Sequence, residues 1–459
     1  MNDYDVVIVG SGTAGQTTAY DLKEAGMRVA VVEKSDRPGG VCAQSGCQPK
    51  KWFYEAAEAV AKCRHLTGKG IVAPPQGSWP DLLREKTAFT AAVPGRTVDG
   101  FDEAGIDFIE GSACFKDRET LSVAGEALKA RFFVIAAGAR PMPLSFPGAD
   151  HLMTSDLWLE QPSLPERIVF VGGGFIAFEF AHFAARLGPK MCRPVILEAA
   201  ERPLGPFDAE MVELLVAASQ AAGIEVRTRI EITSIEASGG GFRVNLAEGP
   251  PLTADQVVHG AGRVPDIDEL GLDAGGVERS RAGITVDAHM RTSNPKVFAV
   301  GDCAATVQLA RVADVEGHAA AKNILAESGQ GEPAAVDYSA VPAVLFSYPQ
   351  LAMVGKTEAA LAKEKTPYRK SAAKNLRGPT YRRVGLEPAA YQIMVGEDGR
   401  FLGAHFLSDS ASGMVNAIRM AMLNGLTAEQ LHDQSIMSPY PTRESDLIYM
   451  LKPLLSGLK

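Results

Sequence analysis

The sequence predicts an α/β protein in which one strand–loop–helix–strand unit occurs twice, followed by a C-terminal α+β region. Three observations support this fold class. Short apolar strands alternate with helical stretches from the start, a glycine-rich loop follows the first strand of each unit, and the region from about Val336 onward carries no such loop. A chain of 459 residues is also too long for one hydrophobic core, and its length favours about three domains.

The first unit opens with the apolar run Val6–Val9, which suits a buried parallel strand. The loop Gly10–Gly15 follows, and we expect a helix over Thr13–Ala25 and a second strand over Val29–Val32 that ends at Glu33. In the pattern G-x-G-x-x-G, the first glycine makes the turn, the second lets the backbone approach a pyrophosphate, and the third lets the helix pack on the strand. The helix N-terminus attracts phosphates, and the acid accepts hydrogen bonds from ribose hydroxyls. Together these features predict a Rossmann-like dinucleotide-binding fold.

The second unit repeats this order. The strand Ile168–Val171 leads into the loop Gly172–Ala177, and we expect the following helix to end at about Leu187. A further strand, Val195–Leu197, then ends at Glu198. The alanine at the third motif position is tolerated by this kind of loop. The repeat therefore predicts a second dinucleotide-binding domain.

Glu198 indicates which nicotinamide cofactor the second unit takes. A carboxylate at the end of the second strand favours the free 2′-hydroxyl of NAD and repels the 2′-phosphate of NADP. We therefore expect NAD. Arg193 and Arg202 lie close in sequence and leave NADP open as an alternative.

The segment Gly39–Lys51 contains two cysteines, Cys42 and Cys47, five residues apart. On a regular helix their side chains would point about 140° apart with a rise of ~7.5 Å, whereas a disulfide needs Cα atoms within roughly 4.4–6.8 Å. The pair can close only if the segment is distorted, and its glycines and Pro49 supply the means. Buried free thiols and a zinc half-site are the alternatives, but zinc needs a second ligand pair, which the sequence lacks. We expect no metal site, and we expect the isolated cysteines to be ordinary thiols; these are Cys63, Cys114, Cys192 and Cys303.

Composition excludes several classes of protein. A net charge of −9 argues against a nucleic-acid-binding surface, which needs clustered Lys and Arg. No apolar run reaches the ~18 residues of a membrane span. The acidic N-terminal segment runs straight into a strand and does not read as a secretory signal. We therefore expect a cytoplasmic protein.

With its flanking motifs, the cysteine segment resembles the active-site segment of the pyridine nucleotide–disulfide oxidoreductases, which include dihydrolipoamide dehydrogenase, glutathione reductase and mercuric reductase. The resemblance covers nearly the whole chain, and among these enzymes the motif set is most similar to dihydrolipoamide dehydrogenase. Five further segments match family motifs in order: Phe133–Pro141 under the flavin, with Ala137 where Thr is usual; Gly260–Pro265 closing the NAD domain; Val297–Asp302 as the second FAD motif; Leu309–Ala313 against the flavin pyrimidine; and Phe346–Ala352 opening the dimerisation domain.

The resemblance implies roles for individual residues. Cys47 is the thiolate nearest the flavin, and Cys42 is the more exposed thiol that exchanges with substrate. Lys51 lies beside the flavin N5 and pairs with Glu179 near the nicotinamide. Only a thiolate reacts, and a nearby cation lowers a thiol pKa; Lys50, where the family usually has Ser or Thr, adds a second positive charge. The remaining residues expected to bind FAD or NAD are Gly10, Gly12, Gly15, Glu33, Lys34, Gly40, Ala137, Gly138, Gly172, Gly174, Ala177, Glu198, Gly262, Asp302, Leu309 and Ala310.

The C-terminal segment departs from the family pattern. Dithiol-handling members carry His-Pro-Thr with a Glu five residues after the His, and the partner subunit supplies this His as the acid–base. Here Tyr440 occupies the His position and Ser445 the Glu position, with Glu444 offset by one residue. A phenol has a pKa near 10 and is a poor base at neutral pH. Tyrosine at this position is similar to mercuric reductases and soluble transhydrogenases. However, the chain lacks the C-terminal cysteine pair of the former, and it has both active-site cysteines, one of which the latter usually lack.

The resemblance implies a homodimeric, FAD-dependent dithiol/disulfide oxidoreductase that passes electrons between NAD(H) and a small or protein-bound disulfide, such as a lipoyl group. A metal-ion reductase similar to mercuric reductase is one alternative, and a slow-turnover redox-sensing flavoprotein is another. We expect an FAD-binding domain over residues 1–148 and 272–335, an NAD(P)-binding domain over 149–271 and a dimerisation domain over 336–459.

Overall fold

The computed structural model describes residues 3–455, which form two compact units. Unit 1 takes its residues from Met1–Trp52, Leu83–Pro143 and Arg263–Tyr338, and unit 2 takes its residues from Phe53–Leu82, Leu144–Gly262 and Ser339–Lys459. Helices α3 (Cys47–Leu66) and α4 (Trp79–Ala91) have residues in both units. The expected domain boundaries near residues 148, 271 and 335 stay a prediction.

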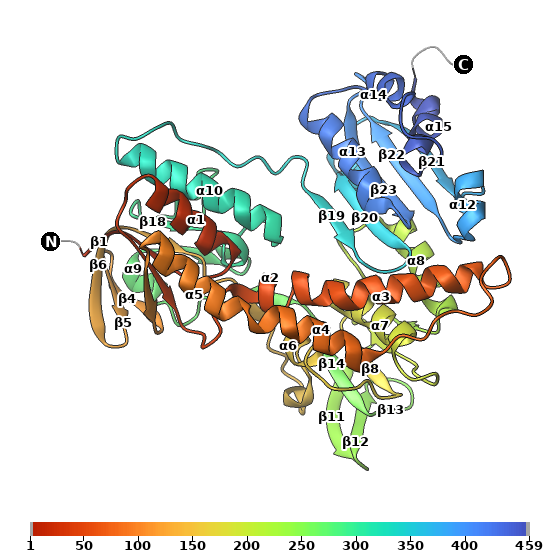
Figure 1. Cartoon of the computed structure of the whole chain (residues 1–459), viewed down its shortest axis with the longest axis horizontal. Helices are drawn as coiled ribbons and strands as arrows, with labels where there is room; N and C mark the ends of the chain where they lie inside the picture. Colours follow the sequence, from red (N-terminus) through yellow and green to blue (C-terminus); the bar gives the residue numbers. More distant parts are fainter. Residues whose placement is uncertain (1–2, 456–459) are drawn as a thin grey trace. The chain divides into compact units, whose positions relative to one another are not determined.

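Within the described residues, a seven-stranded sheet forms the centre of unit 1. Its strands in spatial order are β3 (Asp107–Glu110), β2 (Val29–Glu33), β1 (Tyr4–Val9), β6 (Glu126–Ile135), β5 (Thr120–Val123) and β4 (Ala113–Asp117), and β18 (Val297–Ala299) also pairs with β6. β1 runs parallel to β2 and β6, and all its core-facing residues are apolar. Helices α1 (Thr13–Glu24) and α10 (Ala310–Glu327) lie side by side against this sheet (Figure 1). This arrangement carries the first glycine loop at the carboxyl end of β1.

Unit 2 contains the second nucleotide-binding sheet. Its parallel strands, as far as the structure describes the chain, are β10 (Glu225–Arg227), β9 (Val195–Leu197), β8 (Ile168–Val171) and β14 (Gln256–His259). α7 (Phe175–Leu187) follows β8, and α8 (Ala209–Ala221) follows β9. An antiparallel sheet of β11 (Ile232–Ser238), β12 (Gly241–Leu246) and β13 (Leu252–Ala254) adjoins them. The second strand–loop–helix–strand unit is thus confirmed, and β8 has the predicted bounds.

The C-terminal part of unit 2 is an antiparallel sheet with helices, as expected for an α+β region. Among described residues its strand order is β19 (Pro342–Leu345), β20 (Gln350–Gly355), β23 (Phe401–Ser408), β22 (Ala390–Val395) and β21 (Arg369–Lys374). Helix α13 (Ala411–Leu423) packs against β23 and β20 through an apolar face, and α14 (Ala428–Ser435) and α15 (Leu447–Leu451) follow it (Figure 1).

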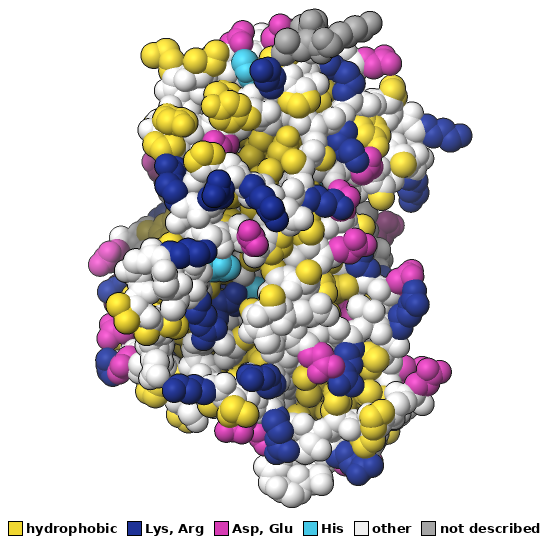
Figure 2. All heavy atoms as spheres, turned by 90° about the vertical axis from the view of Figure 1, so that its right-hand side faces the viewer, with side chains coloured by type: hydrophobic (Ala, Val, Ile, Leu, Met, Phe, Trp, Pro, Cys, Tyr) yellow, Lys and Arg dark blue, Asp and Glu magenta, His cyan; other side chains and the backbone are white. Residues whose placement is uncertain are grey.

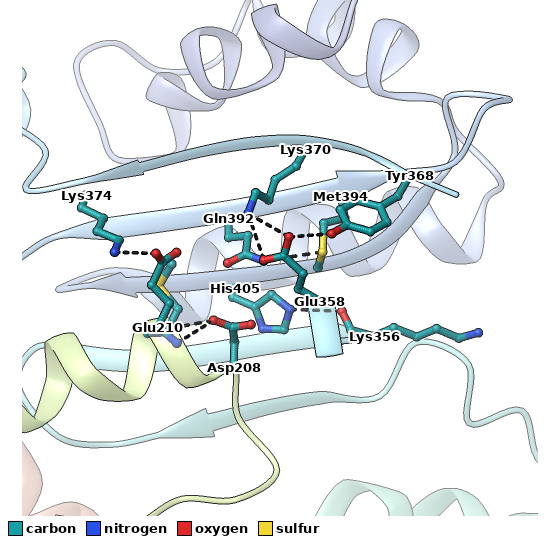
Figure 3. A network of polar contacts seen from close by, with 11 residues as sticks. Asp208, Glu210, Lys356, Glu358, Tyr368, Lys370, Lys374, Gln392, Met394 and His405 are labelled. Atoms are coloured by element: carbon teal, nitrogen blue, oxygen red, sulfur yellow. Dashed lines mark hydrogen bonds and ion pairs between the residues drawn. The ribbon is translucent and has the colours of Figure 1, made fainter. Parts of the chain in front are cut away.

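A polar network, buried at Asp208 and His405 and exposed at its lysines, joins the N-terminus of α8 to this sheet (Figure 3). Asp208 caps α8 by accepting hydrogen bonds from the backbone N–H groups of Glu210 and Met211. The imidazole of His405, on β23, lies between the carboxylates of Asp208 and Glu358, and its Nε2 lies 3.1 Å from the carbonyl oxygen of Lys356. Burial lowers the pKa of His405.

No helix in residues 3–455 is both long and apolar enough to cross a membrane. On the face shown in Figure 2, Lys and Arg side chains are spread among acidic and hydrophobic ones. The described residues contain no cluster of three or more His, Cys, Asp or Glu that could hold a metal ion.

Candidate active site

The first glycine loop connects β1 to α1 in a conformation that only glycine permits. Gly10 has φ +109°, and a Cβ atom there would collide with the carbonyl oxygen of Ala136. A Cβ atom on Gly40 would lie 2.5 Å from the Cα of Gly12, and one on Gly15 would collide with the carbonyl of Gly10. The loop is therefore lined by bare backbone. It presents the N-terminus of α1, as a pyrophosphate cradle requires.

Glu33 ends β2 beside this loop. Its carboxylate accepts hydrogen bonds from the backbone N–H of Ser11 at 2.9 Å, from the Ser11 hydroxyl at 2.6 Å, and from the backbone N–H of Ser35 at 2.9 Å. Lys34 instead forms an ion pair with Asp266, with 2.8 Å between the Nζ and Oδ2 atoms. These contacts hold the acid where the sequence predicts a ribose contact, so the residues present fit a dinucleotide.

The other FAD-side motifs lie in unit 1 as well. Ala137 and Gly138 follow β6, and Gly138 has φ +71°. Asp302 lies in the short 3-10 helix η2 (Gly301–Cys303), and burial raises its pKa. Leu309 is the N-cap of α10, and Ala310 is its first residue.

Sequence reasoning missed Glu316, which holds the Asp302 turn in place. This carboxylate is fully buried in α10 and accepts hydrogen bonds from the Gly301 N–H at 2.6 Å and the Tyr338 hydroxyl at 2.7 Å. Burial raises the pKa of Glu316, and the nearby charge of Asp302 adds to the rise. The available signal was an acid on a largely apolar helix face, because such a residue requires buried partners.

The cysteine segment is distorted as predicted. α2 (Gly40–Gln44) ends at Ser45, and α3 begins at Cys47. A Cβ atom on Gly46 would lie 2.9 Å from the carbonyl oxygen of Val41, so glycine is needed at the break. This break brings Cys42 and Cys47 within hydrogen-bonding reach although they lie on different helices. Both sulfurs are thiols in this structure.

The two thiols have different environments. Cys42 is half-buried and Cys47 is exposed, so the expectation that Cys42 is the more exposed thiol is wrong: Cys47 stands at the open first turn of α3, whereas Cys42 lies within α2. The hydrogen bond that Cys42 donates to Cys47 raises the pKa of Cys42, and burial raises it further, while a hydrogen bond from Thr13 opposes the rise. Cys47 stands at the N-terminus of α3, where the helix dipole favours a negative charge, and Lys51 lies one turn further along. The raised pKa favours the protonated form of the Cys42 thiol.

The second glycine loop repeats the construction of the first. Gly172 has φ +100°, Gly174 is the N-cap of α7, and Ala177 is fully buried. The carboxylate of Glu198 accepts hydrogen bonds from the N–H groups of Gly173 at 2.6 Å and Ala200 at 2.7 Å. Glu198 therefore has the same place in the second unit as Glu33 has in the first.

The nearby arginines point elsewhere. Arg202 donates to the carbonyl oxygens of Leu204, Gly205 and Phe207, and Arg193 donates to that of Cys192. These contacts direct neither guanidinium toward Glu198. The proximity of Arg193 and Arg202 in the sequence therefore gives little support to NADP. Gly262, also expected at this site, has φ +105° in the turn after β14.

The sequence was compared with those of known protein families and proteins, and a family matches most of it. A family profile described as pyridine nucleotide-disulphide oxidoreductase matches residues 4–317. The chain belongs to the pyridine nucleotide-disulphide oxidoreductases. The dimerisation domain of the same family matches residues 341–447. FAD and NAD(P) are the cofactors of this family, and the expected fold and cofactor pair are thereby confirmed.

Several oxidoreductases of this family are similar to this chain over most of their length. Glutathione reductase of Burkholderia cepacia is 32% identical, with 92% of each chain covered. Dihydrolipoyl dehydrogenase of Bacillus subtilis is 31% identical over 93% of this chain and 92% of its own. Mercuric reductase of Staphylococcus aureus is 29% identical over 97% of this chain and 81% of its own. Among solved structures, the HOCl-induced flavoprotein disulfide reductase RclA from Escherichia coli has the same fold, with a TM-score of 0.86 and 24% identity. The match covers 98% of this chain and 99% of RclA.

The oxidoreductase carries its remaining expected site residues in unit 2. Glu179, on α7, is buried, and its Oε1 accepts a hydrogen bond from the Phe346 N–H at 3.0 Å. Tyr440 is 74% exposed in the segment before α15. The structure thus places Cys42, Cys47 and Lys51 in unit 1, and it places Glu179 and Tyr440 in unit 2.

The substrate-side segment around Tyr440 is fixed by its neighbours. Glu444 accepts a hydrogen bond from the Ser410 hydroxyl at 2.6 Å, and this contact directs its carboxylate toward the start of α13. Ser445 exchanges hydrogen bonds with Thr442. Glu444, which lies one residue before the position of the family's Glu, is therefore engaged within its own domain, and Tyr440 is exposed.

Proposed function

We propose that the protein is a homodimeric FAD-dependent dithiol/disulfide oxidoreductase of the dihydrolipoyl dehydrogenase type, which transfers electrons between NADH and a disulfide substrate. The observation that supports this most directly is the helix break at Gly46, which brings Cys42 and Cys47 together. A pair of thiols within hydrogen-bonding reach of each other is placed to alternate between dithiol and disulfide.

Each cysteine has its own task in this proposal. Bound FAD would supply the chemistry that links a two-electron hydride donor, the nicotinamide, to the two-electron reduction of a disulfide. Cys47 faces this cofactor as a thiolate, and Lys51 balances its charge. Cys42 exchanges with the external disulfide, which requires the proton of its thiol to leave. Because the pKa of Cys42 is raised, a proton acceptor from outside the pair governs the rate of this step.

The nicotinamide side follows from unit 2. Glu198 selects NADH through the ribose hydroxyls, and Glu179 lies beside the nicotinamide. The first of these roles is supported by the contacts of Glu198 with the glycine loop and by the engagement of Arg193 and Arg202 elsewhere. The second is supported by the burial of Glu179 near the N-terminus of α7.

The homodimer is supported by the dimerisation domain and by exposed apolar residues in it or just after it. These are Met420, Leu423, Ile436, Met437 and Tyr449. Exposed apolar groups of this kind gain stability when a second subunit covers them. Light scattering during gel filtration tests this state, and a monomer at micromolar concentration would contradict it.

The substrate is tested by steady-state NADH oxidation against lipoamide, glutathione disulfide, Hg²⁺ and quinones, with Cys42→Ser as the control. We expect lipoamide to be reduced fastest and the variant to lose this activity. Tyr440 in place of the family's His favours a second candidate, a metal-ion reductase similar to mercuric reductase. Faster turnover with Hg²⁺ than with any disulfide would support that candidate. Fast quinone reduction that survives Cys42→Ser would overturn both.

A further inference from the structure

Three polar side chains lie on one face of α7, which is otherwise an apolar helix. Glu179, His182 and Arg186 are separated by three and four residues, which places them in line along the helix. They are 1%, 1% and 7% exposed, respectively. Burying such groups is costly unless hydrogen bonds compensate for the lost water. Their partners therefore show what the arrangement is for.

All three side chains bind the backbone of one short segment, Phe346–Tyr348, which connects β19 to β20 in the dimerisation domain. Glu179 accepts from the Phe346 N–H at 3.0 Å. His182 Nδ1 accepts from the Tyr348 N–H at 3.3 Å, and Arg186 donates to the Tyr348 carbonyl oxygen at 2.9 Å. The hydrogen bonds follow the segment in the same order as the residues follow the helix.

The protonation of His182 follows from its neighbours. Ser219 donates its hydroxyl proton to the Leu215 carbonyl oxygen at 2.8 Å, so it accepts the N–H of His182 Nε2 at 2.9 Å. Nδ1 is then the unprotonated nitrogen, and it accepts from the Arg186 guanidinium at 2.7 Å. Burial lowers the pKa of His182 well below its usual value, and it lowers that of Arg186 to about 10. At neutral pH the pair is thus a neutral imidazole that accepts from a cationic guanidinium.

We infer that His182 and Arg186 are positioning residues for the nicotinamide half of the reaction. They fix the Phe346–Tyr348 segment against α7, and the Phe346 N–H in turn fixes one oxygen of Glu179, so that the carboxylate keeps one orientation. The inference rests on the proposed function, in which Glu179 lies beside the nicotinamide. It extends that function by making the geometry of the nicotinamide site depend on the dimerisation domain.

The test uses the FAD-loaded dimer with Arg186→Met, which keeps an unbranched apolar stem in place of the arginine stem and removes the hydrogen bonds of the guanidinium. Ser371→Ala is the matched control, because it also removes a buried side-chain bond to backbone in the dimerisation domain, the 2.7 Å bond to the Met450 carbonyl oxygen. Two readouts are followed: amide hydrogen exchange of the peptide that contains Phe346 and Tyr348, and flavin reduction by NADH under anaerobic stopped-flow conditions.

We expect Arg186→Met to accelerate exchange of that peptide and to slow flavin reduction by about 10-fold to 100-fold at saturating NADH, a range typical of small misplacements in an active site. Re-oxidation of the reduced enzyme by the disulfide substrate stays within about twofold of wild type. Ser371→Ala changes neither the amide exchange of that peptide nor the rate of flavin reduction. If Arg186→Met does not fold, Arg186→Lys and His182→Gln carry the test, with effects in the same direction.

A double-mutant cycle with Glu179→Ala separates the inference from the proposed function on which it rests. Slow flavin reduction in Glu179→Ala, with no additional loss on adding Arg186→Met, supports the inference. Normal reduction in Glu179→Ala would overturn the proposed role of Glu179. Slow reduction in Glu179→Ala combined with wild-type reduction in Arg186→Met would overturn the positioning role alone, as would fully additive losses.

Discussion

The buried carboxylate of Glu316 offers a quantitative test of how the FAD-side turn is held. Replacing it by leucine removes the acceptor of the Gly301 N–H and of the Tyr338 hydroxyl, at 2.6 and 2.7 Å, while keeping the side chain's volume. The Gly301 N–H is then buried without an acceptor. The Tyr338 hydroxyl is half-buried and can turn toward water, so its loss costs less.

The expected loss of stability is the sum of these two effects. A buried donor that loses its partner costs about 1–3 kcal/mol. With Gly301 in the middle of this range and Tyr338 at its lower end, Glu316→Leu destabilises unit 1 by roughly 2–4 kcal/mol. The loss of the Gly301 hydrogen bond also loosens Asp302, which follows Gly301 in the same turn and is expected to bind FAD. FAD affinity therefore falls by at least about tenfold, which corresponds to about 1.4 kcal/mol.

Urea denaturation measures the first quantity, and the fluorescence of FAD released on dilution measures the second. Glu327→Leu is the control, because this carboxylate lies on the same helix and pairs only at the surface with Arg291. A surface pair of this kind contributes about 0–1 kcal/mol. A Glu316→Leu protein that loses stability but retains FAD with wild-type affinity would refute the link from Glu316 to Asp302.

Three further outcomes follow from the structure. Glu198→Gln should raise the ratio of kcat/KM for NADPH to kcat/KM for NADH by about tenfold, because a like charge near a phosphate costs at least about 1 kcal/mol. The control Glu201→Gln, which changes an exposed neighbour, should leave this ratio unchanged. Equal ratios in wild type and both variants would contradict the prediction. Tyr440→His should speed dihydrolipoamide oxidation at neutral pH by at least about tenfold, since a well-placed base contributes ~10²–10⁴-fold to the rate. The control Tyr449→His, at another exposed tyrosine, should not change the rate. If wild type is already fast and Tyr440→His is no faster, another base serves Cys42. Burial lowers the pKa of His405 in the folded state, so the unfolded state binds the proton first and stability is lost as pH falls below the ordinary value of 6.5. The free energy of unfolding of wild type, relative to that of His405→Gln, should fall there by up to about 1.4 kcal/mol per pH unit. A difference that does not change with pH would contradict this prediction.

Features that are local in sequence could be predicted closely. The strand Ile168–Val171 has its predicted bounds, and the helix predicted over Thr13–Ala25 ends one residue earlier, at Glu24. The glycine spacing fixes both loops, because the backbone at Gly10 and Gly172 requires positive φ. The break between the cysteines could also be predicted, since disulfide geometry excludes a regular helix.

What could not be predicted depends on partners far away in the sequence. Glu316 is held by Tyr338, Glu444 by Ser410, and Arg186 by Tyr348, and no pattern within one helix indicates these pairs. The same holds for Arg202, which lies near Glu198 in the sequence but donates to backbone carbonyl oxygens instead of facing the cofactor's phosphate position. Charged residues on apolar helix faces were the available signal, because burial obliges each to find a partner.

The central claim, that electrons from NADH reach the Cys42–Cys47 pair, is tested most directly by counting thiols. The air-oxidised, FAD-loaded protein is treated anaerobically with one equivalent of NADH, alkylated and analysed by mass spectrometry. The proposal predicts that Cys42 and Cys47 become alkylated together only after NADH, with a long-wavelength absorption band that Cys47→Ser lacks, while labelling of Cys63 and Cys114 does not change. Flavin reduction without any new alkylation of the pair would contradict it.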